Sequence, residues 1–187
     1  LLNIYSLSII STSEFLELIN ELWDDSADTF NEKMSDMLNL VLFEPEIPNN
    51  TGSLIRLSAN MGANLHLIKP YGFEITDKRL RRAGLDYKEL ANVYEYENFD
   101  DYLDKAAPSK IYIVSTKVKT SYADVKYFRE DSFLFGSETK GLPKEIMDEY
   151  DGITLPMQKG SRSLNLANCV SIVAYEAWRQ LGFSISK

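Results

Sequence analysis

The sequence predicts an α/β fold: a mostly parallel sheet with helices on both faces. Three observations indicate this fold class. Short apolar runs that suit buried parallel strands alternate with helical patterns along the 187 residues. The longest helical pattern lies near the carboxyl end, where apolar residues recur at spacings of three and four. Loops that contain glycine follow several strands, at the edge where open α/β sheets bind ligands.

Charge divides the chain into two parts. Of its 28 acidic and 20 basic residues, eight acids and one base lie in residues 1–36, a net charge of −7. The other 20 acids and 19 bases give residues 37–187 a net charge of −1. Residues 1–36 are therefore predicted to be an acidic N-terminal extension with one short helix and a linker. Residues 37–187 form the main domain, which is neutral enough to carry a local basic patch.

The first half of the main domain begins with a continuous apolar run at residues 38–43, which suits a buried parallel strand. After a loop rich in proline and asparagine, residues 53–61 are predicted to be helical, with Arg56 on the second turn. Residues 64–69 form the next strand, closed by a proline and a glycine. Residues 92–96 form a third, short strand.

The second half continues the alternation. Residues 99–106 are predicted to be helical, and residues 110–116 form a strand rich in isoleucine and valine. The apolar run at residues 133–136 leads into a glycine-rich turn, followed by a helix at residues 143–150 and a strand at residues 152–155.

The last element is a long helix at residues 165–181. One apolar stripe runs along it: Leu166, Val170, Val173, Ala174, Ala177 and Leu181. Small polar residues precede it, so its start offers backbone N–H groups and hydroxyls to a ligand. An ordinary capped C-terminal helix is the alternative.

Single residues exclude several kinds of site. The only histidine, His66, lies in an apolar run and is predicted to be a packed strand residue, so no Ser-His-Asp triad can form. The only cysteine, Cys169, rules out a disulfide framework, and no metal-ligand spacing occurs. We expect no membrane span and no signal peptide, and hence a cytoplasmic protein.

Two loops and one basic cluster remain as candidate sites. The loop at residues 47–56 suits an anion at a helix start, although a plain cap is the alternative. In the loop at residues 136–141, glycines allow another molecule to approach the backbone. The cluster Lys78, Arg79, Arg81 and Arg82 is either a solvated helix face or a patch for RNA phosphates. Chemistry here has to come from a bound cofactor.

Three segments resemble, in chain order, the three motifs of the SPOUT superfamily of knotted RNA methyltransferases. They are IPNNTGSLIR (47–56), LFGSETKGLP (134–143) and LPMQKGSRSLNLANCVSIVAYEAWRQ (155–180). The segments KRLRRAGLDY and YEAWRQLG further resemble the tRNA (cytidine/uridine-34) 2′-O-methyltransferase family. The resemblance covers about residues 37–183.

This resemblance implies a deep trefoil knot at the carboxyl end, S-adenosylmethionine as cofactor and a homodimer that packs through the C-terminal helix, with Tyr175 at the contact. It implies methylation of the wobble pyrimidine of leucine tRNAs, bound through the anticodon stem-loop. The alternatives are a catalytically silent tRNA- or ribosome-binding protein of the same fold and, on the residues alone, a flavodoxin-like nucleotide-binding module. Binding of S-adenosylmethionine rather than a nucleotide or flavin separates the last from the others.

The resemblance also implies roles for residues. The expected cofactor-binding residues are Val114, Thr116, Gly136, Leu155, Met157, Ser163 and Leu164. The expected catalytic residues are Arg56, Glu138 and Asn165. A guanidinium stays charged, so Arg56 is expected to orient phosphate and hydroxyl and to stabilise developing charge rather than act as a base. The expected RNA-binding residues are Lys78, Arg79, Arg81, Arg82 and Arg162, and no metal is expected.

Overall fold

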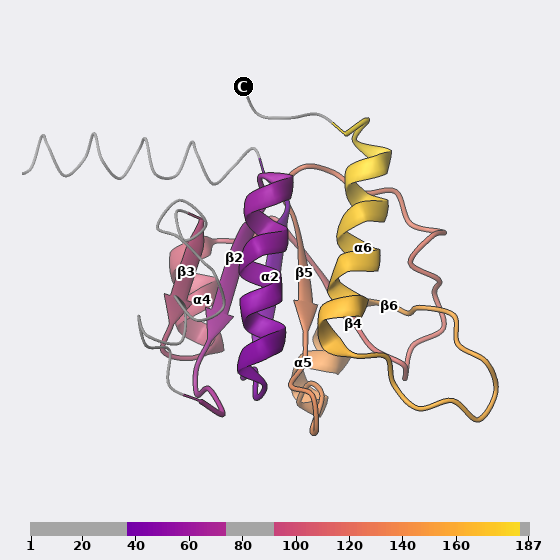
Figure 1. Ribbon diagram of the computed structural model, residues 1–187, viewed down its shortest axis with the longest axis horizontal. Coiled ribbons are helices and arrows are strands. Elements are labelled where there is room, and N and C mark those ends of the chain that lie inside the picture. Colours follow the sequence, from indigo (N-terminus) through magenta and orange to yellow (C-terminus); the bar gives the residue numbers. More distant parts are fainter. Residues whose placement is uncertain (1–36, 74–91, 184–187) are drawn as a thin grey trace, which may run out of the picture. The chain divides into compact units, whose positions relative to one another are not determined.

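The computed structural model of the chain describes residues 37–73 and 92–183. Within these ranges six parallel strands form one sheet in the order β3-β2-β1-β5-β4-β6 (Figure 1). The strands are β1 (Asn39–Phe43), β2 (Asn64–Ile68), β3 (Val93–Tyr96), β4 (Lys110–Val114), β5 (Asp131–Phe135) and β6 (Asp151–Ile153). The helices are α2 (Pro48–Met61), α4 (Phe99–Ala106), α5 (Lys144–Glu149) and α6 (Leu166–Gln180). The predicted α/β class with a parallel sheet is confirmed.

Helices cover both faces of the sheet. In Figure 1, α2 and α6 lie side by side in front of it. The side chains of β1 alternate between two buried clusters, because successive strand residues point to opposite faces. Leu40 and Leu42 pack with α2 and α6, whereas Val41 and Phe43 pack with α4 and α5. This explains why the strand reads as a continuous apolar run rather than an alternating one.

Helix α2 begins earlier than predicted. It starts at Pro48, whose fixed φ suits the first helical position, so the predicted start at Ser53 is wrong. Arg56 consequently lies on the third turn rather than the second. Ile47 makes no side-chain cap. Instead the Glu138 carboxylate accepts from the backbone N–H groups just before the helix, a cap that nearby sequence cannot reveal.

Several strands also end earlier than predicted. Strand β4 stops at Val114 rather than at residue 116, and β6 stops at Ile153 rather than at residue 155. The backbone of Thr154 bonds to Thr120 and Tyr122 in the β4–β5 loop instead of continuing along β4. By contrast, α4 has the predicted bounds, and α6 is capped by Asn165, whose side chain accepts from the N–H of Asn168.

His66 is the packed strand residue that the sequence predicts. Its side chain is buried, with Nδ1 2.9 Å from the Tyr96 hydroxyl and Nε2 3.1 Å from Oδ1 of Asn39. That oxygen can only accept, so Nε2 carries the hydrogen and Nδ1 accepts from Tyr96. Burial lowers the pKa of His66 to about 3.

Two groups of predicted features lie outside the described residues: the acidic segment 1–36 and the cations Lys78, Arg79, Arg81 and Arg82. Across residues 37–73 and 92–183, no helix has the length and apolar character needed to cross a membrane.

Candidate active site

A cavity of about 450 Å³ lies at the edge of the sheet where the strands end. Three connecting segments surround it: the β4–β5 loop (residues 115–130), the glycine loop (residues 136–143) and the β6–α6 loop (residues 154–165). The N-terminal ends of α2 and α6 reach the same edge, which is the lower one in Figure 1. Open α/β sheets bind their ligands at this carboxyl edge.

The structure places all the predicted cofactor residues around this one cavity. Its lining includes Val114, Thr116, Gly136, Leu155, Met157, Ser163 and Leu164. The predicted catalytic residues Glu138 and Asn165 also line it, whereas Arg56 and Arg162 are exposed and are not among its lining residues. The segments brought together here are separated by up to 115 residues in sequence.

Apolar side chains form much of the wall, and sequence reasoning missed several of them. Phe135, Leu142 and Leu166 line the cavity, as does Cys169. Phe135 and Leu142 both belong to the motif segment 134–143, so their place in that segment was an available signal. Cys169 lies four residues after Asn165, which places it on the same side of α6. Burial raises the pKa of the Cys169 thiol to about 11.

A chain of hydrogen bonds joins all three motifs. Oε1 of Glu138 in the glycine loop accepts from Nδ2 of Asn50 at 2.8 Å, and Nδ2 of Asn165 donates to Oδ1 of Asn50 at 3.0 Å. Oδ1 of Asn165 in turn accepts from the N–H of Asn168. Each amide therefore has its oxygen and nitrogen assigned by its neighbours, which fixes the orientation of Asn165 at the cavity.

The segment just before α2 and the glycine loop each provide a carboxylate that accepts hydrogen bonds from the other. Glu138 accepts from the N–H of Glu46 at 2.8 Å and from that of Ile47 at 3.2 Å. Glu46 reciprocates by accepting from the hydroxyl of Thr139 at 2.7 Å and from its N–H at 3.2 Å. A carboxylate thus occupies the start of α2, where the sequence left open an anion site or a plain cap. No local pattern marks Glu46 or Asn50 as a site residue, because their partners are more than 85 residues away.

Gly136 lines the cavity, and the structure adds a second reason for a glycine at this position besides the expected approach of a ligand. A Cβ atom there would lie 2.3 Å from the carbonyl carbon of Gly141 and 2.5 Å from the nitrogen of Leu142. The backbone that approaches Gly136 is therefore that of its own loop. The loop closes through the N–H of Gly141, which donates to the carbonyl of Ser137 at 2.9 Å.

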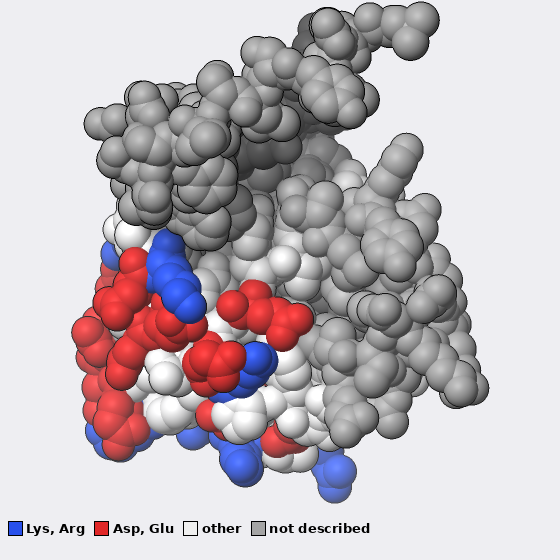
Figure 2. Space-filling model, turned by 90° about the vertical axis from the view of Figure 1, so that its left-hand side faces the viewer, with Lys and Arg blue, Asp and Glu red and all other residues white. Residues whose placement is uncertain are grey.

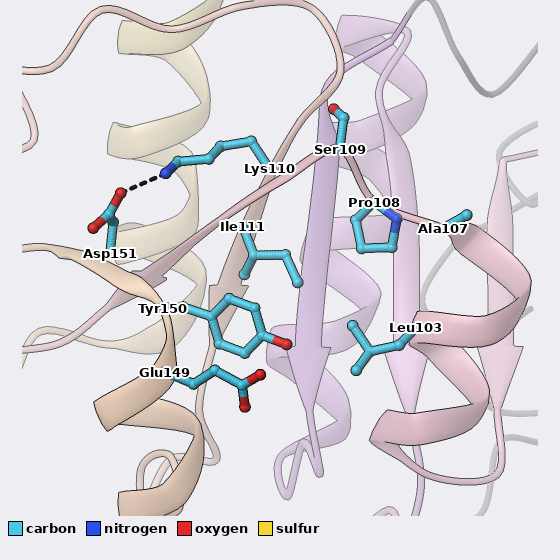
Figure 3. Close-up of a pocket in the computed structure, with 9 residues that line it drawn as sticks. All are labelled: Leu103, Ala107, Pro108, Ser109, Lys110, Ile111, Glu149, Tyr150 and Asp151. Carbon is cyan, nitrogen blue, oxygen red and sulfur yellow. Dashed lines mark hydrogen bonds and ion pairs between the residues drawn. The ribbon is translucent and has the colours of Figure 1, made fainter.

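A second cavity, of about 510 Å³, lies at the opposite edge, where β4 begins (Figure 3). Leu103, Pro108 and Ile111 give it an apolar side, and Lys110 and Asp151 form an ion pair across the other side. No residue of the three motif segments lines it. Its position at the amino edge of the sheet separates it from the predicted site.

Comparisons with known proteins agree with this geometry. A tRNA (cytidine(34)-2′-O)-methyltransferase of Yersinia pestis is 54% identical over 155 residues, 79% of this chain and 96% of that protein. A structure solved to study 2-OH methylation of C/U34 on tRNA superposes with a TM-score of 0.73 at 38% identity, covering 79% of this chain and 98% of the other.

A further solved structure shows the shared fold at lower identity. The SpoU methyltransferase AviRb from Streptomyces viridochromogenes, in complex with the cofactor AdoMet, has a TM-score of 0.68 at 24% identity and covers 80% of this chain and 62% of its own. Residues 37–175 match the SpoU rRNA Methylase family. The match takes in the sheet, the three loops and most of α6, and the chain belongs to this family.

Proposed function

We infer that the protein is a tRNA (cytidine(34)-2′-O)-methyltransferase that uses S-adenosylmethionine. The observation that carries this inference is the meeting of three motif segments around one cavity at the carboxyl edge of the sheet. The name of the 54% identical relative and the family match support it. They favour this function over a flavodoxin-like module, and the assembled cavity favours an active enzyme over a silent RNA-binding protein.

The cavity fits the cofactor in size and chemistry. Its volume of about 450 Å³ lies in the range of small-molecule sites, and its wall combines apolar side chains with loop backbone groups. Leu155, Met157 and Leu164 would contact the adenine, while the backbone of the glycine loop and Ser163 would supply polar contacts. When bound, S-adenosylmethionine supplies a methyl group carried on a positively charged sulfur.

The residues of the chain would then orient the ribose 2′-hydroxyl. Asn165, held by Asn50 and Glu138, presents a fixed amide at the cavity. Arg56 is exposed on α2, the helix whose start Glu138 caps, and would hold the phosphate of the target nucleotide and stabilise charge that develops on the oxygen. The apolar part of the wall would reduce the number of water molecules around the transfer, which would strengthen these interactions.

We propose wobble pyrimidines of leucine tRNAs, bound through the anticodon stem-loop in the cytoplasm, as the substrates. The resemblance of the motif segments supports this choice. The test is nucleoside mass spectrometry of tRNA incubated with the protein and S-adenosylmethionine, with a 2′-deoxy wobble transcript as the blank. A 2′-O-methylpyrimidine at the wobble position is expected, and methylation of the deoxy transcript would contradict the hydroxyl target.

We propose a homodimer that packs through α6. Its outer face exposes Ile172 and Tyr175, and the Tyr175 ring meets that of Trp178 edge-on at 5.5 Å. Phe183 extends this apolar surface beyond the end of the helix. Such a contiguous patch is typical of an interface. Light scattering should give the mass of a dimer, and Tyr175→Glu should give that of a monomer.

We further propose the trefoil knot of the SPOUT superfamily. The β4–β5 loop bonds to the chain at the start of the β6–α6 loop and at the end of α6. Thr154 bonds to Thr120 and Tyr122 at the first place, and the side chain of Gln180 bonds to Val125 and Tyr127 at the second. This arrangement supports a chain threaded through that loop.

Residues 37–187 are proposed to be the methyltransferase domain, with residues 1–36 dispensable. Removal of residues 1–36 should leave methylation unchanged or raise it at low salt, because a net charge of −7 is lost. A large loss of activity in a folded, shortened protein would make this segment functional.

A further inference from the structure

Ten of the thirteen Lys and Arg side chains in the described part of the chain fall into two groups. On strands, helices and their ends, Lys69, Lys105, Lys110, Lys144 and Arg179 each pair with a carboxylate. Within residues 37–73 and 92–183, five exposed cations have no side-chain partner: Lys117, Lys119, Lys140, Lys159 and Arg162. All five lie in the three loops that surround the cavity. We call these five residues the basic rim.

The loops around the cavity are positive although the whole chain carries a net charge of −8. Residues 115–130, 136–143 and 154–165 together contain seven Lys or Arg and three Asp or Glu, a net charge of +4. One of the three acids, Glu138, already accepts from the N–H groups of Glu46 and Ile47, so it is not available to pair with the rim.

Acidic residues gather elsewhere on the surface. Figure 2 shows them over the side of the molecule that carries β3 and α4, with Lys and Arg side chains along the lower edge, where the strands end. The acids of β3 and α4 include Glu95, Asp100 and Asp104, which are exposed. The charges of the described residues therefore repel a polyanion from the α4 side and attract it to the edge that holds the cavity.

We propose that the basic rim binds backbone phosphates of the RNA strand on both sides of the nucleotide to be methylated. The inference rests on the proposed function and names how its substrate is held. Exposed cations with no protein partner can bind phosphate without first breaking an ion pair. A lysine ammonium is a point charge that reads no base, so the rim supplies affinity and position rather than sequence choice.

The rim has two kinds of member. Lys117 and Lys140 line the cavity. These two lysines could therefore bind the carboxylate of the cofactor as well as an RNA phosphate. Lys119 and Lys159 are not among the lining residues. A variant that changes only these two therefore tests phosphate binding without altering the wall of the cofactor cavity.

The experiment compares two double variants of equal charge. Lys119→Gln with Lys159→Gln changes the rim, whereas Lys105→Gln with Lys144→Gln removes the same charge from α4 and α5. The dissociation constant for an unmodified leucine tRNA is measured between about 50 and 200 mM KCl. Each lost phosphate contact lowers the slope of log K against log salt by about 0.7 to 0.9. For the rim variant we expect the slope of log K against log salt to be about 1.5 smaller in magnitude and the affinity at low salt to be roughly tenfold lower. The control variant should match the wild type in both.

Equal slopes for the two double variants would overturn the proposal. A second pair, Lys117→Gln with Lys140→Gln, is measured with S-adenosylmethionine and with methylthioadenosine, which lacks the amino acid part. Weaker binding of the first ligand only, with unchanged tRNA affinity, would assign these two lysines to the cofactor and not to the rim.

The outcome is separable from that of the proposed function. If the wild type methylates the wobble nucleotide and the slopes are equal, the rim is wrong and the function stands. If the wild type methylates no tRNA but the rim variant alone loses slope, the rim is an RNA-binding surface and the proposed reaction is wrong.

Discussion

The carboxylate of Glu138 accepts a hydrogen bond from the side-chain amide of Asn50 at 2.8 Å, although 88 residues separate the two in sequence. The same carboxylate accepts from the backbone just before α2. One side chain therefore ties the glycine loop to the helix that carries Arg56. The position of α2 relative to the cavity depends on this contact.

Glu138→Gln should destabilise the fold and slow methyl transfer. A Gln side chain keeps the shape but places an NH₂ group against N–H donors, so at least one donor loses its partner. We expect a loss of about 2 kcal/mol in the free energy of unfolding and a fall of about 4–8 °C in Tm. Glu145→Gln, on the exposed first turn of α5, is the matched control and should change stability by less than about 0.5 kcal/mol. Equal Tm values for the two variants would show that the contact contributes little.

Gly136→Ala should destabilise the glycine loop more than Gly152→Ala does. At Gly136 the new Cβ meets backbone atoms at 2.3 and 2.5 Å, which cannot move without opening the loop. At Gly152 it meets the Val118 side chain at a similar 2.5 Å, but a methyl group at the end of a side chain can shift. We expect about 1–3 kcal/mol for the first, by urea denaturation, and clearly less for the second. The reverse order would contradict this account of the loop.

The sequence predicted the parallel sheet well because the spacing of apolar residues within a short segment already indicates a buried strand or an amphipathic helix. Two examples are the apolar run at residues 38–43 and the apolar stripe of α6. Both patterns involve only residues that are close in the sequence. The expected cofactor residues came from the resemblance, and most of them lie within its contiguous motif segments. That these residues meet around one cavity depends on strand order, which no local pattern contains.

What the sequence could not predict lies in contacts between distant segments. Glu46 and Thr139 are 93 residues apart, and neither has a local feature that marks it. The cap of α2 comes from Glu138 and is distant in the same way, whereas Pro48 was a local signal for the start of this helix. Gly136 was identified as important, yet only the structure shows that Gly141 fills the space beside it.

The stability of the protein should fall in acid partly through His66. Its pKa is lowered to about 3 by burial, whereas an unfolded histidine titrates near about 6.5. Between these values the unfolded chain binds a proton that the folded one does not, so stability is present above about pH 6.5 and lost as the pH falls. The expected loss from this group is about 1.6 kcal/mol between pH 6.5 and 5. His66→Gln should be less stable at pH 7 but lack this part of the pH dependence in urea unfolding. Parallel curves for the two proteins would contradict it.

Cys169 should react slowly with iodoacetamide. With a thiol pKa of about 11, only a small fraction is thiolate at pH 8, and the rate should rise roughly tenfold per pH unit up to pH 10. It is the only cysteine, so the label has one site. Because Cys169 lines the cavity, S-adenosylmethionine should slow the labelling further. A rate that levels off near pH 8.5, or that ignores the cofactor, would place the thiol in a more open setting.

Arg56→Ala should lower methyl transfer while leaving cofactor binding nearly unchanged. Arg56 is exposed on the third turn of α2 and is not among the residues that line the cavity. The affinity for S-adenosylmethionine, measured by calorimetry, should therefore stay within about threefold, which is below about 1 kcal/mol.

The single-turnover rate on a leucine tRNA should instead fall by at least about a hundredfold for Arg56→Ala. The guanidinium would stabilise the charge that develops on the attacking oxygen and would also hold the adjoining phosphate, and the variant loses both interactions. Arg56→Lys keeps the charge but loses the planar fork, so it should recover little of the rate if two oxygens are held together. Lys105→Ala, which removes a positive charge paired with Asp101 on α4, is the control for loss of positive charge and should transfer methyl at close to the wild-type rate. If Arg56→Ala matches that control, Arg56 takes no part in the transfer. If it instead loses cofactor affinity in proportion to rate, Arg56 acts on the cofactor cavity and not on the ribose.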